Sequence, residues 1–123
     1  MTRILVFAEP ELARQLSAVL SAQGYNTISC SSEQEALRQV ITFAPQLVLA
    51  EYLDLDGEWL CRQIRQLKKG KQTEVIMMSA AGSHLSDKDM EAMVLSFGAN
   101  GYLRKPFIHD KISSYVRSWL RAS

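Results

Sequence analysis

The chain has 123 residues, of which 47% are hydrophobic and 22% charged, and its formal net charge is +1. This composition fits one globular domain over residues 1–123, and it argues against disordered chains and against strongly basic proteins that bind nucleic acid or membranes through charge. No apolar run approaches the ~20 residues that span a bilayer, no signal peptide opens the chain, and the cysteines lack disulfide or zinc spacing, so we expect a reduced, cytoplasmic protein.

Short apolar runs alternate with amphipathic segments along the whole chain. The runs predict strands at residues 4–8, 25–30, 47–50, 75–78 and 101–104. Apolar residues at helical spacing predict helices from Pro10 to Gly24, from Ser32 to Ile41, from Gly57 into the basic stretch Lys68–Lys71, from Ser86 to Gly98, and over Ile112–Leu120.

The expected helix starts and ends carry their own signals. Pro10 suits the first turn of a helix, and Ser32 is followed three residues later by Glu35, the spacing of a capping box. Gly24 and Gly98 are typical helix stops. The second helix is expected to bury an apolar face that consists of Ala36, Leu37, Val40 and Ile41.

Strands that alternate with helices of this length predict an α/β fold, in which a parallel sheet carries helices on both faces. Because crossover connections are right-handed, few topologies remain, and we expect the doubly wound (βα)5 arrangement with strand order 2-1-3-4-5. The first strand is not followed by a glycine-rich phosphate-binding loop, which argues against a dinucleotide-binding domain.

Polar residues stand at the carboxyl ends of four predicted strands. They are Glu9 after the first strand, Glu51 after the third, Ser79 after the fourth and Lys105 after the fifth. Parallel strands bring their carboxyl ends to one edge of the sheet, where ligands and chemistry collect in open α/β folds. The expected strand order makes the first, third and fourth strands neighbours, so we predict that these residues line one pocket.

The order of these residues resembles the receiver domain of two-component response regulators. The most specific matches are Phe97-Gly98-Ala99 and the run Tyr102-Leu103-Arg104-Lys105-Pro106-Phe107, and Ser79-Ala80 supports them. The resemblance extends over the whole chain, starting at Ile4-Leu5-Val6, and it implies the flavodoxin-like receiver fold. It also implies a bacterial origin, because the family is chiefly bacterial.

In this family, an Asp at the end of the third strand accepts a phosphoryl group from a histidine kinase, and two acidic residues after the first strand help to hold Mg²⁺. A Ser or Thr and a Lys contact the phosphoryl oxygens, and the resemblance assigns these roles to Ser79 and Lys105. The sequence departs from the pattern at two positions. Glu51 stands at the phosphoacceptor position, and Ala8 replaces one acid of the pair, which leaves only Glu9.

These departures predict a degenerate site. Glu is one methylene longer than Asp, which moves the carboxylate by ~1 Å, beyond the tolerance of a preorganised site for phosphoryl transfer. The loss of one acid weakens a site for a hard cation, so we expect at most a weak magnesium site at Glu9 and Glu51 and otherwise no cofactor. Our hypothesis is that Glu51 reaches toward Lys105 or Ser79 and fixes one signalling state without phosphate.

Structural interpretations stay open for the same residues. Glu51 could be a solvated strand-end carboxylate, Ser79 a loop cap, and Lys105 a member of a structural ion pair. The resemblance further implies that Tyr102 is the aromatic switch residue and that the bond before Pro106 is cis, although a static, half-buried Tyr102 is an equal alternative.

We therefore predict a signalling module that is not an enzyme: an atypical receiver that acts through protein contacts and independently of phosphorylation. The resemblance places its partner surface on the fourth helix, the fifth strand and the fifth helix. That face would present parts of Asp87 to Ser96, Tyr102, Arg104 and Lys111 to Arg121. The expected partners are a histidine kinase, an output domain, another signalling protein or a second copy, and neither nucleic acid nor a membrane.

Two alternatives remain open at this point. One is a working receiver that is phosphorylated with Mg²⁺, either on Glu51 or on Asp54 or Asp56 in the loop that follows. The other is a flavodoxin-like domain or enzyme that binds a small ligand, for which the sequence offers neither a glycine-rich loop nor a nucleophile paired with a base.

Overall fold

The computed structural model describes residues 1–52, 56–79, 85–104 and 112–122. The strands in these ranges are β1 (Arg3–Phe7), β2 (Asn26–Cys30), β3 (Leu47–Glu51), β4 (Glu74–Ser79) and β5 (Gly101–Arg104). The helices are α1 (Pro10–Ala22), α2 (Glu33–Thr42), α3 (Gly57–Gln66), α4 (Asp87–Ser96) and α5 (Ile112–Ala122), and a 3-10 helix, η1, covers Lys69–Gln72.

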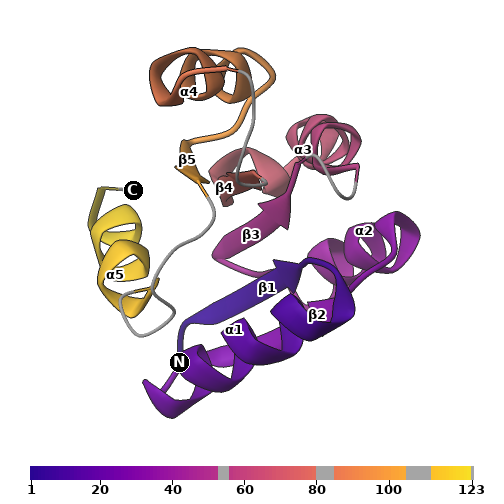
Figure 1. Cartoon of the computed structure of the whole chain (residues 1–123). Coiled ribbons are helices and arrows are strands. Elements are labelled where there is room, and N and C mark those ends of the chain that lie inside the picture. Colours follow the sequence, from indigo (N-terminus) through magenta and orange to yellow (C-terminus); the bar gives the residue numbers. More distant parts are fainter. Residues whose placement is uncertain (53–55, 80–84, 105–111, 123) are drawn as a thin grey trace.

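The strands form one parallel sheet in the order β2-β1-β3-β4-β5 (Figure 1). The predicted doubly wound α/β fold is therefore confirmed. The register places the end of β3 between the ends of β1 and β4, because Ala50 pairs with Phe7 and Glu51 pairs with Met78. The carboxyl ends of these three strands consequently share one edge of the sheet, where the sequence predicts the pocket.

Two apolar clusters of described residues fill the spaces between sheet and helices, one on each face. Val48 and Ala50 of β3 belong to the cluster under α2, α3 and α4. Leu47 and Leu49 belong to the cluster under α1 and α5. Because β3 is covered on both faces, all of its residues are buried, and its sequence is a continuous apolar run rather than an alternating pattern.

Most helix signals in the sequence have the predicted roles, but the expected capping box is formed only in part: Ser32 accepts from the N–H of Glu35, whereas the Glu35 carboxylate binds Arg38 and Gln39. Pro10 is the first residue of α1, and the side chains of Ser32 and Ser86 accept backbone N–H bonds at the starts of α2 and α4. Gly24 and Gly98 follow the ends of α1 and α4 with φ angles of +94° and +108°. Glycine adopts this left-handed conformation at little steric cost, which explains its place after a helix.

Two predictions about the helices are wrong. Ile41 is 61% exposed, because the inner side of α2 consists of the buried Ala36 and Val40 and the partly buried Leu37, as the sequence predicts for these three. The third helix does not continue into the basic stretch, since α3 ends at Gln66 and the chain then tightens into η1. Gly70 allows this close turn, because a Cβ there would collide with the backbone at the end of α3.

The two cysteines act as apolar side chains of the core. Cys30 in β2 and Cys61 in α3 are both free. Burial, together with the charge of Glu35, raises the pKa of the Cys30 thiol to about 11, and burial also raises the pKa of Cys61. Both thiols are therefore neutral near pH 7 and act as small apolar side chains.

Among the described residues, no helix combines the length and the apolar character that crossing a membrane requires.

Candidate functional site

The candidate site is centred on Glu51, the last residue of β3. Its side chain is 0% exposed, so it is not the solvated strand-end carboxylate that the sequence left open as an alternative. A buried carboxylate is costly unless hydrogen-bond donors or positive charge replace the lost water. The partners of Glu51 therefore decide what this edge of the sheet can do.

Glu51 contacts the start of α1. Its Oε1 accepts a hydrogen bond from the backbone N–H of Glu9, with an N–O distance of 2.5 Å. This amide lies at the amino end of the helix, where backbone N–H groups have no partner within the helix and the helix dipole favours negative charge. The bond joins the end of β3 to the segment that follows β1, across neighbouring strands.

Glu9 is the N-cap residue of α1, and its own carboxylate is turned toward that helix. Oε1 of Glu9 accepts from the N–H of Leu12 at 2.7 Å, and Oε2 accepts from the N–H of Glu11 at 3.1 Å. The carboxylate thus satisfies two of the first amides of the helix, a role usually taken by shorter side chains. The residue predicted as a pocket acid therefore also starts α1.

The start of α3 lies directly against the end of β3. Gly57, the first residue of α3, is buried, and a Cβ at this position would collide with the backbone carbonyl oxygen of Glu51. Asp56 caps the same helix, because its Oδ1 accepts from the N–H of Trp59 at 3.0 Å. The end of β3 is consequently held by α1 through a side chain and by α3 through close backbone packing.

Tyr52 connects this strand end to α4, a link that the sequence interpretation missed. Its ring centroid lies 5.6 Å from that of Phe97, and its hydroxyl donates to the sulfur of Met93 at 3.7 Å. Burial raises the pKa of the Tyr52 hydroxyl, and the carboxylates of Glu58 and Asp56 add to this effect. The available signal was an aromatic residue directly after a buried strand, but its orientation depends on the packing of α4.

The other predicted site residues are only partly within the described part of the chain. Tyr102 lies in β5, is half-buried and packs against the cluster under α2, α3 and α4. The side chain of Ser79 lies outside the described residues, and so do all of Lys105, Pro106 and Asp54. The structure therefore brings the Glu51 carboxylate to the backbone N–H of Glu9, while the carboxylate of Glu9 accepts from other amides of α1.

The carboxylates of Glu9 and Glu51 fit a magnesium site poorly. Mg²⁺ prefers an octahedral set of oxygen ligands. No three His, Cys, Asp or Glu side chains of the described residues come together as a metal ion would require. Three of the four carboxylate oxygens of this pair already accept backbone N–H bonds, which takes up part of their capacity to bind a cation.

Comparison with known proteins places these features in a family context. The family model of the response regulator receiver domain matches residues 4–117. The alkaline phosphatase synthesis transcriptional regulatory protein PhoP of Bacillus subtilis is 29% identical over 123 residues, which make up 98% of this chain and 48% of PhoP. The response regulator ArlR of Staphylococcus aureus is 30% identical over 124 residues, or 98% of this chain and 53% of ArlR. The chain therefore spans about half the length of these curated relatives.

Solved structures share the fold. A protein from Chloroflexus aurantiacus described as a response regulator matches with a TM-score of 0.84 and 28% identity over 98% of both chains. The receiver domain of the sensor histidine kinase PA1611 from Pseudomonas aeruginosa matches with a TM-score of 0.80 and 23% identity, again over 98% of both chains. That structure has a magnesium ion coordinated in its active-site cleft, and at this identity the likeness concerns the fold alone.

Proposed function

The chain belongs to the response regulator receiver domain family, and on that premise we propose that it is a degenerate receiver. In this proposal it is a signalling module that acts through protein contacts, is not an enzyme and does not accept a phosphoryl group. The observation that carries the proposal is the 2.5 Å hydrogen bond from the backbone N–H of Glu9 to the fully buried carboxylate of Glu51.

The geometry of Glu51 disfavours phosphoryl transfer. An acceptor carboxylate has to present an oxygen in line with the phosphoryl donor, and small displacements are costly. Glu51 instead directs Oε1 to the start of α1, inside the protein. Its extra methylene, relative to Asp, moves the carboxylate by ~1 Å from the position that the family chemistry uses.

Independence from Mg²⁺ is part of the same proposal. Ala8 is fully buried, belongs to the apolar cluster under α1 and α5, and supplies a methyl group where the family has an acid. Both oxygens of Glu9 accept N–H bonds of α1. The acids that remain after β1 and β3 therefore bind backbone amides at the start of α1, which occupies oxygen lone pairs that a cation would need.

We further propose that Glu51 fixes one signalling state without phosphate. The end of β3 contacts α1 and α3, and the next residue, Tyr52, contacts α4. In this proposal, the conformation of Glu51 therefore influences the position of α4, which is part of the proposed partner surface. A contact of Glu51 with Lys105 or Ser79 remains a hypothesis, because Lys105 and the side chain of Ser79 lie outside the described residues.

The proposed partner surface consists of α4, β5 and α5. Arg104 of β5 forms a salt bridge with Asp87 and donates to the carbonyl oxygen of Leu85 at 2.7 Å, so β5 is tied to the start of α4. Leu95 and Tyr115 expose apolar surface on α4 and α5. We propose that this face binds a histidine kinase, an output domain, another signalling protein or a second copy, and neither nucleic acid nor a membrane.

The proposal is tested by incubation with acetyl phosphate and Mg²⁺, followed by intact-mass spectrometry. We expect no gain of a phosphoryl group, whereas a receiver with Asp at the acceptor position gains one under the same conditions. An adduct in the wild-type chain that disappears in Glu51→Gln would establish a working receiver and contradict the proposal. An adduct that persists in Glu51→Gln and maps by fragmentation to Asp54 or Asp56 would establish a substitute acceptor.

A further inference from the structure

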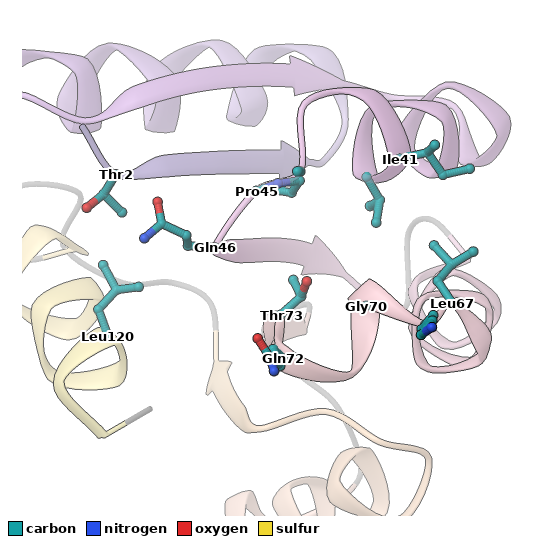
Figure 2. Close-up of a pocket in the computed structure, with 12 residues that line it drawn as sticks. Thr2, Ile41, Pro45, Gln46, Leu67, Gly70, Gln72, Thr73 and Leu120 are labelled. Atoms are coloured by element: carbon teal, nitrogen blue, oxygen red, sulfur yellow. The ribbon is translucent and has the colours of Figure 1, made fainter.

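A cavity of about 710 Å³ lies at the amino ends of the strands, at the opposite edge of the sheet from Glu51. Figure 2 shows it between the ends of α2 and α3, the start of β3, and Leu120 of α5. Its volume is within the range of small-molecule sites, ~300–1,000 Å³. The cavity shares no residue with the candidate site, and neither the family nor the proposed function assigns it a role.

The apolar part of the cavity is formed where α2 ends and β3 begins. Ile41 and Pro45 line it, and Leu67, which follows α3, lies opposite Ile41 (Figure 2). The sequence wrongly predicted Ile41 to be buried; it is 61% exposed and lies at the edge of this cavity. These three apolar side chains therefore line a cavity and do not pack together into a core.

Both walls of the cavity are held by arginine side chains. Ala44 has a left-handed φ of 50°, which is strained for a residue with a Cβ, and its carbonyl oxygen accepts from Nε of Arg3 at 3.0 Å. On the other side, Nη1 of Arg65 donates to the carbonyl oxygens of Gly70 and Thr73 at 2.8 and 2.7 Å. The cavity is therefore preformed, which lowers the ordering cost of binding.

The charge of the cavity is positive. Among the lining residues that the structure describes, Lys68 is the only charged side chain, and no carboxylate is present. Lys71 is exposed and stands in the sequence between two lining residues, Gly70 and Gln72. Gln46 and Thr73 contribute an amide and a hydroxyl to the same lining (Figure 2). Lys68 and Gly70 of the basic stretch, which has no role at the Glu51 edge, thus form part of this wall.

We propose that the cavity binds a small amphipathic carboxylate. The apolar body of the ligand packs on Ile41, Pro45 and Leu67, and its carboxylate pairs with Lys68. One lysine in the lining balances one negative charge, so a multiply charged phosphate fits less well than a monocarboxylate. The absence of acids from the described lining disfavours a cationic ligand.

Occupancy would give the domain an input at the edge opposite Glu51. The ligand would contact α2, η1 and α5 together. Arg65, which binds the carbonyl oxygens of Gly70 and Thr73 in the lining, would connect it to the turn before β5 through its bond to the carbonyl oxygen of Gly98 at 2.8 Å. Because no residue is shared with the Glu51 edge, the cavity can bind a ligand whether or not Glu51 accepts a phosphoryl group. The two proposals can therefore fail separately.

The experiment is a titration of the full chain with sodium decanoate, below its micelle concentration, followed by amide NMR. We expect saturable shifts that concentrate in residues 40–46 and 67–73. Two matched pairs of variants test the assignment: Ile41→Glu with Leu95→Glu as its control, and Lys68→Glu with Lys88→Glu as its control. All four side chains are exposed, so the fold should tolerate each change.

The cavity variants should lower the affinity for decanoate about tenfold or more, and the α4 controls should change it less than about twofold. Absence of saturable shifts, shifts centred on another surface, or unchanged affinity in Ile41→Glu would overturn the proposal. Equal affinity for decan-1-ol would overturn the preference for a carboxylate. Flotation of the chain with phosphatidylglycerol vesicles tests whether the cavity binds a lipid surface and not a free carboxylate. If the wild-type chain floats with the vesicles and Lys68→Glu does not, the surface binds membranes and the proposal is overturned.

Discussion

Glu51 combines two properties that rarely occur together at a strand end, because it is a carboxylate and it is fully buried. An ionised carboxylate inside a protein needs donors that replace its water. The N–H of Glu9 is one such donor, and its place at the start of α1 adds the favourable potential of a helix end. Glu is one methylene longer than Asp, and in this chain the longer side chain reaches the amide at the start of α1.

The first prediction concerns the removal of this carboxylate. Glu51→Ala takes away the acceptor of the Glu9 amide, so we expect the free energy of unfolding to fall by ~1–3 kcal/mol. Glu51→Gln keeps a carbonyl acceptor and should lose less than half of that amount. Urea unfolding followed by circular dichroism measures both variants, and Glu91→Ala, exposed on α4, should stay within ~0.5 kcal/mol of the wild type. Wild-type stability in Glu51→Ala would show that the bond does not hold the start of α1.

The position of Glu51 could be predicted from the sequence, whereas its bond to the backbone N–H of Glu9 could not. A continuous apolar run followed by a carboxylate indicates the end of a buried strand, and the edge of the sheet follows from the fold. The partner is a backbone amide, which nearly every residue carries and no side-chain pattern marks. Pro10 was the available signal, because a proline at the first helical position makes Glu9 the N-cap.

Arg65 of α3 connects elements that are distant in the sequence. Its Nε donates to the carbonyl oxygen of Gly98, and its Nη2 donates to Oδ1 of Asn100 at 2.6 Å. Its Nη1 donates to the carbonyl oxygens of Gly70 and Thr73. One guanidinium therefore joins α3, η1, the segment before β4 and the turn between α4 and β5, and the planar fork of Arg is what reaches all of them.

The second prediction tests this connection with two substitutions on one helix. Arg65→Lys keeps the charge but cannot donate in several directions from a planar group, so we expect it to lower the free energy of unfolding by ~2–3 kcal/mol. Arg62→Lys is the matched control, since Arg62 is exposed on the same helix and makes an ion pair with Glu58 and a cation–π contact with Phe97, both of which a lysine can also make. Its effect should stay within ~0.5 kcal/mol. Equal effects of the two substitutions would mean that Arg65 contributes only a surface charge.

Helix starts were easier to predict than helix faces. Ser32 and Ser86 cap through bonds within their own helices, so local sequence determines them. Whether Ile41 is covered depends on which side chains pack against α2, and that is a property of the tertiary structure. The same holds for η1, because the carbonyl oxygens of this turn and of Thr73 are bound by Arg65, a residue of the preceding helix.

The two faces of the molecule are joined through shared strands. Leu5 and Phe7 of β1 pack under α2, α3 and α4, whereas Ile4 and Val6 of the same strand pack under α1 and α5. β3 divides its side chains between the clusters in the same way. Loss of either helix layer would therefore expose alternate residues of the central strands, and the sheet would lose half of its cover.

The third prediction follows from this arrangement and uses the two tryptophans of the chain. Trp59 packs against the cluster under α2, α3 and α4, and Trp119 packs against the cluster under α1 and α5, so each reports on one face. In the single-tryptophan variants Trp119→Phe and Trp59→Phe, the fluorescence of the remaining tryptophan measures unfolding of its own face.

Because the faces share β1 and β3, we expect one cooperative transition. Both signals are measured on the same variant, so the effect of the substitution on stability is the same for both. In each variant, the urea midpoint from tryptophan fluorescence should agree with the midpoint from circular dichroism within ~0.2 M. A Trp119 transition that precedes the dichroism transition would mean that α1 and α5 detach from a sheet that remains folded. In that case the bond between Glu9 and Glu51 would be broken before the rest of the domain unfolds, and the fixed state proposed for Glu51 would lack the structural support on which it depends.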